Sequence, residues 1–166
     1  MYYRRATHAT RKFGDDAYAA RHADLRLKSP LSDSDILQIQ AENALRSGSY
    51  DSAKILLQRL IALPSASADV LAEAVYDLGL AFYEQKEYSE ARSRFQEALN
   101  RKIDREQWLT PWSHYYRGIC HAKLGNEADA RKDLEQVLDF DEYDFKNWLA
   151  FRTKRELEKL EHNRTG

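Results

Sequence analysis

Cysteine, methionine, proline and glycine are all scarce in this 166-residue chain, which has one, one, three and six of them respectively. A single cysteine excludes an internal disulfide framework and a cysteine-rich metal cage. Few glycines and prolines disfavour a sheet of short strands joined by tight turns, and they favour long helices. No apolar run approaches the roughly 18 uninterrupted residues that a membrane-spanning helix needs, so we expect no membrane insertion.

The charge of the chain is unevenly distributed. Hydrophobic residues at 43% and charged residues at 32% are typical of one folded globular domain. The net charge of −1 combines an acidic middle with two basic ends, at residues 1–28 and 146–166. Such a division favours electrostatic steering of a partner, although solvated helix faces would produce it as well.

Two interpretations of the N-terminus stay open. Arg4, Arg5, Arg11 and Lys12 precede the first acid, Asp15, which is typical of an organelle leader. The acids at Asp15 and Asp16 interrupt that pattern early. We therefore expect a cytoplasmic protein, with an organelle leader as the alternative.

Three segments of the chain superimpose on one another, residues 37–61, 75–99 and 114–138. In each segment a small residue is followed twelve positions later by alanine; the pairs are Ala41 and Ala53, Gly79 and Ala91, and Gly118 and Ala130. Only small side chains fit where two helices cross at about 8–10 Å. Residues three and four apart share one helix face, so apolar residues following each alanine form a stripe. The pattern predicts three helical hairpins.

A turn is expected within each hairpin. Gly48 and Gly125 fall between the paired helices of the first and third segments, where a residue must leave the helical conformation. Lys86 occupies the same position in the middle segment. The hairpins therefore share one turn position with different residues in it.

The middle segment resembles the tetratricopeptide repeat. The matching residues are Leu78, Gly79, Phe82, Ala91, Phe95 and Ala98. The resemblance implies an all-α fold, a right-handed superhelix of helical hairpins (an α–α superhelix). The alanines lie 38 and 39 residues apart, against 34 in the usual repeat. The extra residues fall between hairpins, at 63–68 and 101–105.

This interpretation divides the chain into five parts. They are a basic N-terminal segment that could be a degenerate repeat (1–30), three hairpins (31–64, 69–103 and 110–140), and a capping helix with a charged tail (141–166). Thr110 is the expected N-cap of the third hairpin, with Pro111 at the first helical position. The last helix is expected from Phe145 to Leu160, closing the stack.

No catalytic motif stands out. The chain has no phosphate-binding glycine loop, dinucleotide fingerprint or nucleophile elbow. His114 and His121 lie about 10 Å apart on one predicted helix, too far to share a metal ion, and favour packed roles within the hairpin. Cys120 is expected to be a small core residue. We therefore predict a non-enzymatic protein without a metal or cofactor.

The resemblance implies that the first helix of each hairpin lines a concave groove. The residues predicted to face a partner are Gln38, Glu42, Arg46, Tyr76, Leu80, Tyr83, Trp112, Tyr115, Ile119 and Lys123. Aromatic side chains suit an apolar or aromatic peptide or helix of another protein, because they bury large areas with few rotatable bonds. We expect an adaptor, scaffold or assembly subunit with no small-molecule substrate.

Three alternatives remain at this point. The first is a secretion or assembly chaperone, because some of these have a similar length and number of repeats. The second is a component of a nucleic-acid complex that contacts the backbone through its basic ends, although nucleic acid is not the favoured partner. The third is that the C-terminal helix or the N-terminal segment fills the groove.

Overall fold

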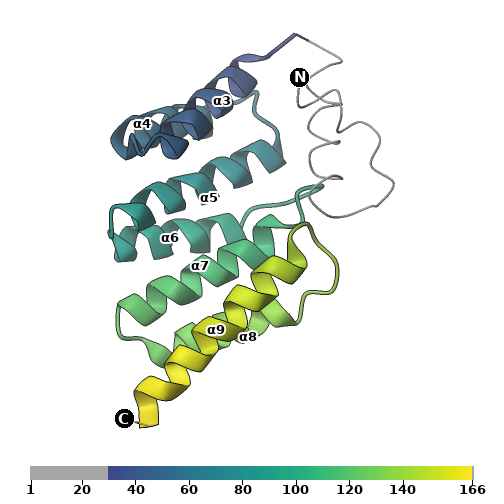
Figure 1. The fold of residues 1–166 in the computed structure, drawn as a ribbon. Helices are drawn as coiled ribbons and strands as arrows, with labels where there is room; N and C mark the ends of the chain where they lie inside the picture. Colours follow the sequence, from purple (N-terminus) through teal and green to yellow (C-terminus); the bar gives the residue numbers. More distant parts are fainter. Residues whose placement is uncertain (1–29, 166) are drawn as a thin grey trace.

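A computed structural model describes residues 30–165, which form seven α-helices and no strand (Figure 1). The helices are α3 (Asp33–Arg46), α4 (Tyr50–Ile61), α5 (Ala68–Glu84), α6 (Tyr88–Leu99), α7 (Leu109–Lys123), α8 (Glu127–Leu138) and α9 (Lys146–Thr165). The predicted basic segment and degenerate repeat lie outside the described residues, except for Pro30. None of the seven helices is long and apolar enough to cross a membrane.

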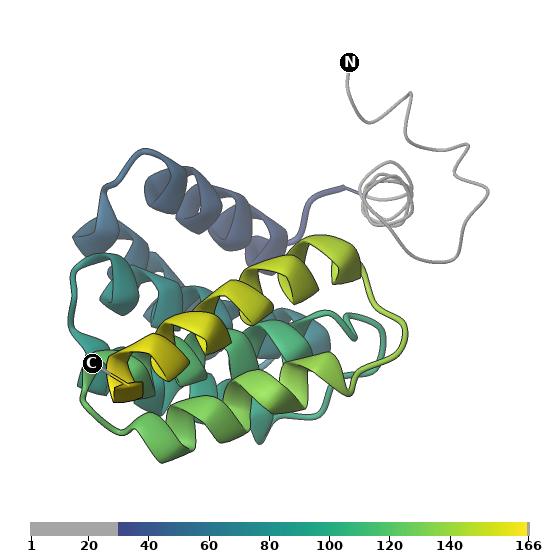
Figure 2. The same cartoon turned by 60° about the horizontal axis from the view of Figure 1, so that its bottom comes forward.

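Consecutive helices pack as three hairpins, α3–α4, α5–α6 and α7–α8, followed by α9 (Figures 1 and 2). The first helices of the hairpins also touch one another in the order α3, α5, α7, and α9 continues this row against α7. Among the described elements, α4, α6 and α8 do not touch one another. The row of first helices is therefore the tighter one, and the stack curves around it as an α–α superhelix.

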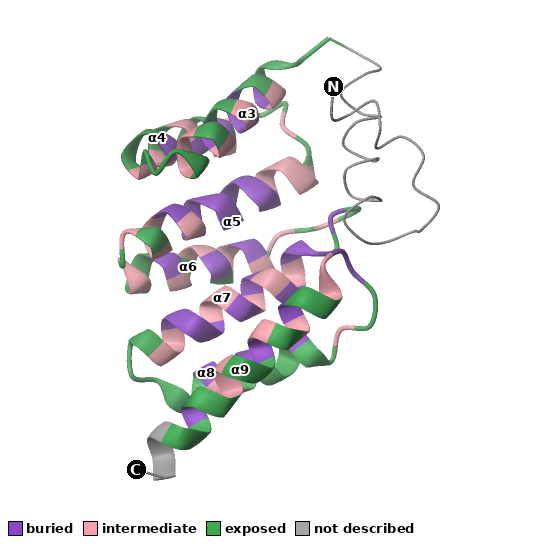
Figure 3. Ribbon diagram, in the orientation of Figure 1, coloured by how far each residue is buried: buried purple, intermediate pink, exposed green. Residues whose placement is uncertain are grey.

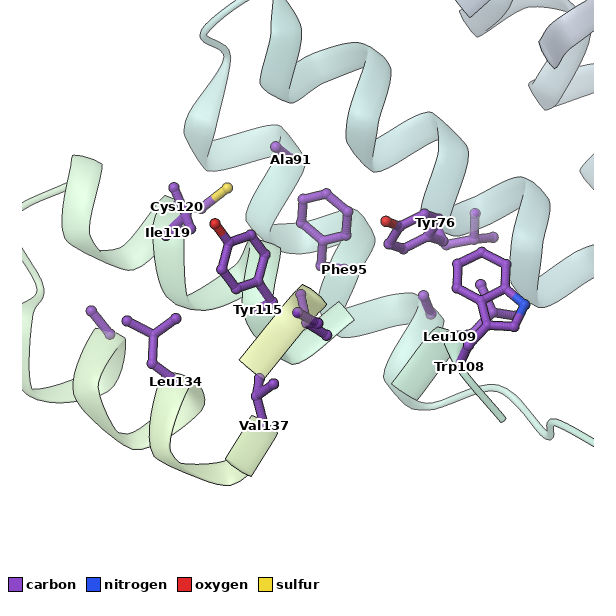
Figure 4. Close-up of a cluster of buried hydrophobic side chains, with 14 of the residues drawn as sticks. Tyr76, Ala91, Phe95, Trp108, Leu109, Tyr115, Ile119, Cys120, Leu134 and Val137 are labelled. Carbon is purple, nitrogen blue, oxygen red and sulfur yellow. The ribbon is translucent and has the colours of Figure 1, made fainter. Parts of the chain in front are cut away.

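The core lies between the two rows of helices. Buried positions run along the middle of each hairpin, and α5 is buried over most of its length (Figure 3). Phe95 is fully buried and its ring contacts Tyr76 on α5 at 5.7 Å between centroids (Figure 4). A Cβ at Gly79 would lie 2.7 Å from Cε1 of Phe95, so the absence of a side chain there makes room for this ring.

The two other small-residue pairs are buried as well. Ala41 and Ala53 are fully buried in the first hairpin. A Cβ at Gly118 would lie 3.2 Å from the carbonyl oxygen of Ala130. The small residues therefore mark the close approach of paired helices, although at Gly79 the nearest neighbour is Phe95.

The three hairpin turns adopt one backbone conformation. Gly48, Lys86 and Gly125 have φ values of 75°, 64° and 80°. This left-handed region is cheap for glycine and strained for other residues. Lys86 adopts it because the hairpin geometry on either side is the same, as the equivalent turn position in the sequence indicates.

Two predicted helix starts are wrong. α7 begins at Leu109, so Thr110 is inside the first turn and does not cap the helix. The earlier start follows from burial of Trp108 and Leu109, with the indole Nε1 of Trp108 donating to Glu106 at 2.8 Å. α9 begins at Lys146 because Phe145 has a φ of 67°, which a helix excludes.

Candidate functional site

The first helices of the hairpins and α9 together present one surface, which we call the A face: the side of α3, α5, α7 and α9 turned away from α4, α6 and α8. All ten residues predicted to face a partner lie on these helices. Arg46 and Lys123 are exposed at the C-terminal ends of α3 and α7. Four more of the ten predicted residues are partly exposed: Glu42, Leu80, Tyr83 and Trp112.

The other four predicted site residues are buried, and this corrects the prediction for them. They are Gln38, Tyr76, Tyr115 and Ile119. Gln38 is covered because its Nε2 donates to Oε2 of Glu73 on α5 at 2.8 Å. Tyr115 is only 2% exposed because α9 places the guanidinium of Arg152 over its ring at 5.4 Å. Contacts between neighbouring first helices thus remove these side chains from the surface.

Aromatic rings pack together between α5, α6 and α7. Tyr116 contacts several of these rings. Its ring centroid lies 5.2 Å from that of Tyr83, 5.5 Å from that of Phe95 and 6.1 Å from that of Trp112. Burial raises the pKa of Tyr83 to about 12, so its phenol is neutral at physiological pH. The sequence interpretation did not include Tyr116 among the residues predicted to face a partner.

The aromatic surface extends onto α9. Trp148 stacks on Trp112 with ring centroids 5.2 Å apart, and Arg152 lies over Trp148 at 4.6 Å. Trp148 nevertheless remains 51% exposed. Sequence reasoning assigned Trp148 to the capping helix without giving it a place on the partner surface.

α9 does not fill the A face. It contacts α7 and α8 but, within the described chain, none of α3 to α6. Leu149 and Leu160 are buried against the rest of the stack, whereas Phe151 points outward and is exposed. The C-terminal helix therefore extends the row of first helices by one member, and most of the row stays uncovered by it.

Acidic side chains gather at the other end of the A face, between α3 and α5. Glu73 and Asp77 lie one turn apart on α5, and both are buried. Glu42 lies on α3 and its negative charge acts on Asp77. Sequence reasoning missed Glu73 and Asp77, although four-residue spacing places them on one face of α5.

A separate polar cluster lies inside the third hairpin. Asp133 on α8 is buried and accepts hydrogen bonds from Nε of Arg117 at 2.7 Å and from His114 Nδ1 at 3.0 Å. Burial acts to raise the pKa of Asp133, but the hydrogen bonds from Arg117 and His114 outweigh burial and lower it. The cluster joins α7 to α8, so His114 has a packed, hydrogen-bonded role.

Two of the three hairpins match the model of a known repeat family. Residues 73–101 and 112–140 each match the family model of the tetratricopeptide repeat. These segments coincide with most of α5–α6 and with α7–α8. These hairpins are tetratricopeptide repeats. No curated protein matches the chain.

Tetratricopeptide repeats are generally protein–protein interaction modules without catalytic activity. Burial raises the pKa of the Cys120 thiol to about 12, which makes it a poor nucleophile at neutral pH. Among residues 30–162, no three His, Cys, Asp or Glu side chains are placed to hold a metal ion.

A pocket of about 240 Å³ lies away from the A face, beside the loops that precede α7 and α9. Its lining includes Ile103, Phe140 and Tyr143. The hydroxyl of Tyr143 is buried and has no hydrogen-bond partner in the described chain. The volume of the pocket is below the roughly 300–1,000 Å³ of a typical ligand pocket.

Proposed function

We propose that this chain is an adaptor, scaffold or assembly subunit whose A face binds an apolar or aromatic segment of another protein. The observation that carries the proposal is the half-exposed Trp148, which stacks on Trp112 and has the guanidinium of Arg152 over its ring. Tryptophan is enriched among the residues that dominate binding energy at protein interfaces. A tryptophan fixed before binding also loses little conformational freedom on binding.

The neighbouring residues support the same surface. Tyr83 and Leu80 are partly exposed on α5, next to the first helix that carries Trp112. An apolar surface bounded by the charged ends Arg46 and Lys123 has the composition of an interface, with an apolar centre and a polar rim. A peptide crossing α5, α7 and α9 would contact all three helices.

The test is to select peptides that bind the 166-residue chain from a random dodecapeptide display library. The affinity of synthetic copies is then measured by fluorescence anisotropy. We expect Trp148→Ala and Tyr83→Ala to weaken binding about tenfold or more each, since each removes a large aromatic contact. Both variants should keep cooperative thermal unfolding, because these side chains are partly exposed.

Ile55→Ala is the matched control. Ile55 is an exposed apolar residue on α4, in the other row of helices, at 60% exposure. Its removal should leave peptide affinity unchanged. The proposal is wrong if the A-face substitutions change affinity no more than Ile55→Ala does.

A further inference from the structure

The loop between α6 and α7 and the loop between α8 and α9 lie at the same end of the stack and enclose the pocket of about 240 Å³, which we call the loop pocket (Figure 1). Of its lining, only Thr110 belongs to the helices of the A face, and the proposed function gives the pocket no role. A cavity of about 150 Å³ is large enough for one benzene molecule. The loop pocket therefore has room for a group of side-chain size.

Two aromatic rings and one aliphatic side chain line the loop pocket, those of Phe140, Tyr143 and Ile103. Phe140 and Ile103 are partly exposed, so their apolar surface is open to solvent in the free protein. Such walls favour an alkyl chain, because burial removes apolar surface from water. The faces of aromatic rings also attract cations. The lining therefore suits an apolar stem that ends in a positive charge.

Tyr143 also contributes a polar atom that lacks a partner. The residue is 4% exposed, and within the described chain its hydroxyl has no hydrogen-bond partner. Burial raises the pKa of Tyr143 to about 12, so the phenol stays neutral at pH 7. A buried polar atom without a partner costs stability, and such atoms are usually satisfied by a water molecule or a ligand. A group in the pocket that donates to the phenol oxygen would satisfy this hydroxyl.

The charged residues of the lining are both acids, Asp141 and Glu142. Both are exposed, and among the described residues neither carboxylate has a hydrogen bond or an ion pair. The nearby base Lys146 donates to the backbone carbonyl oxygen of Asp141 and is not part of the lining. The described residues offer no third ligating side chain for a metal ion here. The two carboxylates therefore favour an organic cation beside the aromatic walls.

We propose that the loop pocket binds an alkylammonium group, the head of a lysine side chain or of a free alkylamine. An alkylammonium has three N–H donors. The lining provides three acceptor groups, the hydroxyl of Tyr143 and the carboxylates of Asp141 and Glu142. The alkyl stem packs against Ile103 and Phe140. This site does not depend on the A face, so it stands or fails separately from the proposed function.

The test is methyl NMR of the 166-residue chain during titration with n-butylammonium chloride, at constant ionic strength. The methyl group of Ile103 reports on the loop pocket. The methyl group of Ile55, which is exposed on α4, is the internal control. 1-Butanol is the neutral probe of similar size. Circular dichroism melts establish that each variant is folded.

We expect n-butylammonium to shift the Ile103 signal and to leave the Ile55 signal unchanged. Binding should be weak, because a ligand of so few atoms has a low attainable affinity. 1-Butanol should bind about fivefold or more weakly, since it has no charge to pair with the carboxylates. If 1-butanol binds as well as n-butylammonium, the pocket is merely apolar and the proposal is wrong.

A double variant locates this preference for charge. With Asp141→Asn and Glu142→Gln together, the two probes should bind within about twofold of each other, because the groups that recognise the cation are missing. The matched control is Glu90→Gln with Glu127→Gln, which removes two exposed acids from α6 and α8 outside the lining. The control should keep the full preference. An equal loss in both double variants would show a general effect of net charge and exclude the site.

Tyr143→Phe tests the hydroxyl, because it removes the oxygen and keeps the ring. It should weaken n-butylammonium about fivefold, the effect of one hydrogen bond. Tetramethylammonium has no N–H donor, so its affinity should be the same for the wild type and for Tyr143→Phe. A change of equal size for both cations would mean that the substitution alters the pocket and that no donor reaches the hydroxyl.

Further arms identify the source of the group. Nα-acetyl-lysine N-methylamide should bind more tightly than n-butylammonium if the ligand is a lysine of a protein chain, and more weakly if it is a free amine. The chain's own Lys12 and Lys28 are replaced by glutamine in a separate variant. If the probes bind only to that variant, the chain fills its own pocket and the external ligand is wrong. If Ile103 responds to no cation in either background, the pocket holds water alone and the proposal is refuted, while the A-face proposal is untouched.

Discussion

Neutralising Asp77 should stabilise the protein, and the gain should depend on pH. The folded-state pKa of Asp77 is about 8, whereas the ordinary value is 3.8. Between these values the folded state binds a proton that the unfolded state has released, so stability falls as pH rises from about 4 to about 8. The amide introduced by Asp77→Asn does not titrate, so this variant does not lose stability in this way as the pH rises.

The size of the gain follows from the cost of an unpaired polar group in the protein interior, about 1–3 kcal/mol from mutational data. Each pKa unit corresponds to about 1.4 kcal/mol, so the full shift sets an upper limit of about 6 kcal/mol. Partial exposure of Glu42 admits water, which reduces the repulsion between the two carboxyl groups. We expect Asp77→Asn to gain about 1–3 kcal/mol at pH 8 and close to nothing at pH 4.

Urea unfolding at pH 4, 6 and 8 measures this difference, with Asp139→Asn, at an exposed position at the end of α8, as the control. Because Asp77 and Glu42 act on each other electrostatically, the difference between the curves reports the loss of the Asp77 carboxyl group together with its effect on Glu42. In thermal melts the gain corresponds to roughly 2–4 °C for each kcal/mol in a chain of this size. A loss of stability in Asp77→Asn at pH 8, or a gain of equal size at pH 4 and pH 8, would refute the reasoning.

Three further predictions concern the core. Gly79→Leu should cost about 3 kcal/mol or more in urea unfolding, because even a Cβ would lie 2.7 Å from Phe95; a cost below 1 kcal/mol would contradict this packing. Asp133→Asn should cost about 3–5 kcal/mol at pH 7, because Arg117 loses the carboxylate to which it donates, and the cost should shrink as the pH falls through the lowered pKa of Asp133. Cys120 should react with a thiol reagent at pH 8 about 100-fold or more slowly in the native state than in urea, as absorbance would show.

Local sequence features predicted the hairpins well. The twelve-residue step from Gly118 to Ala130 encodes a contact within one helix–turn–helix unit, so no knowledge of the rest of the fold is needed. The turn at Lys86 was predicted from its position, since the flanking helices fix the backbone whatever the residue. The helix starts at Leu109 and Lys146 were harder, because neither the burial of Trp108 against Tyr76 nor the positive φ of Phe145 follows from the local pattern.

The accessible part of the A face could not be predicted in the same way. Tyr76 and Tyr115 have equivalent positions, three residues before the small residue of their hairpins, and both are buried although the pattern predicted them to face a partner. Tyr115 is covered by Arg152, which is 37 residues further along the chain. Periodicity shows which way a side chain points from its own helix, but it does not show what a distant helix places over it.

The two buried aspartates should respond in opposite ways to neutralisation. Asp133 has its partners within the chain, so neutralising it should destabilise the protein; Asp77 accepts no hydrogen bond from the described residues, so neutralising it should stabilise the protein. If Asp77→Asn instead lost stability as Asp133→Asn should, the carboxyl group of Asp77 would be a structural element of the fold, and burial would not be its dominant electrostatic cost.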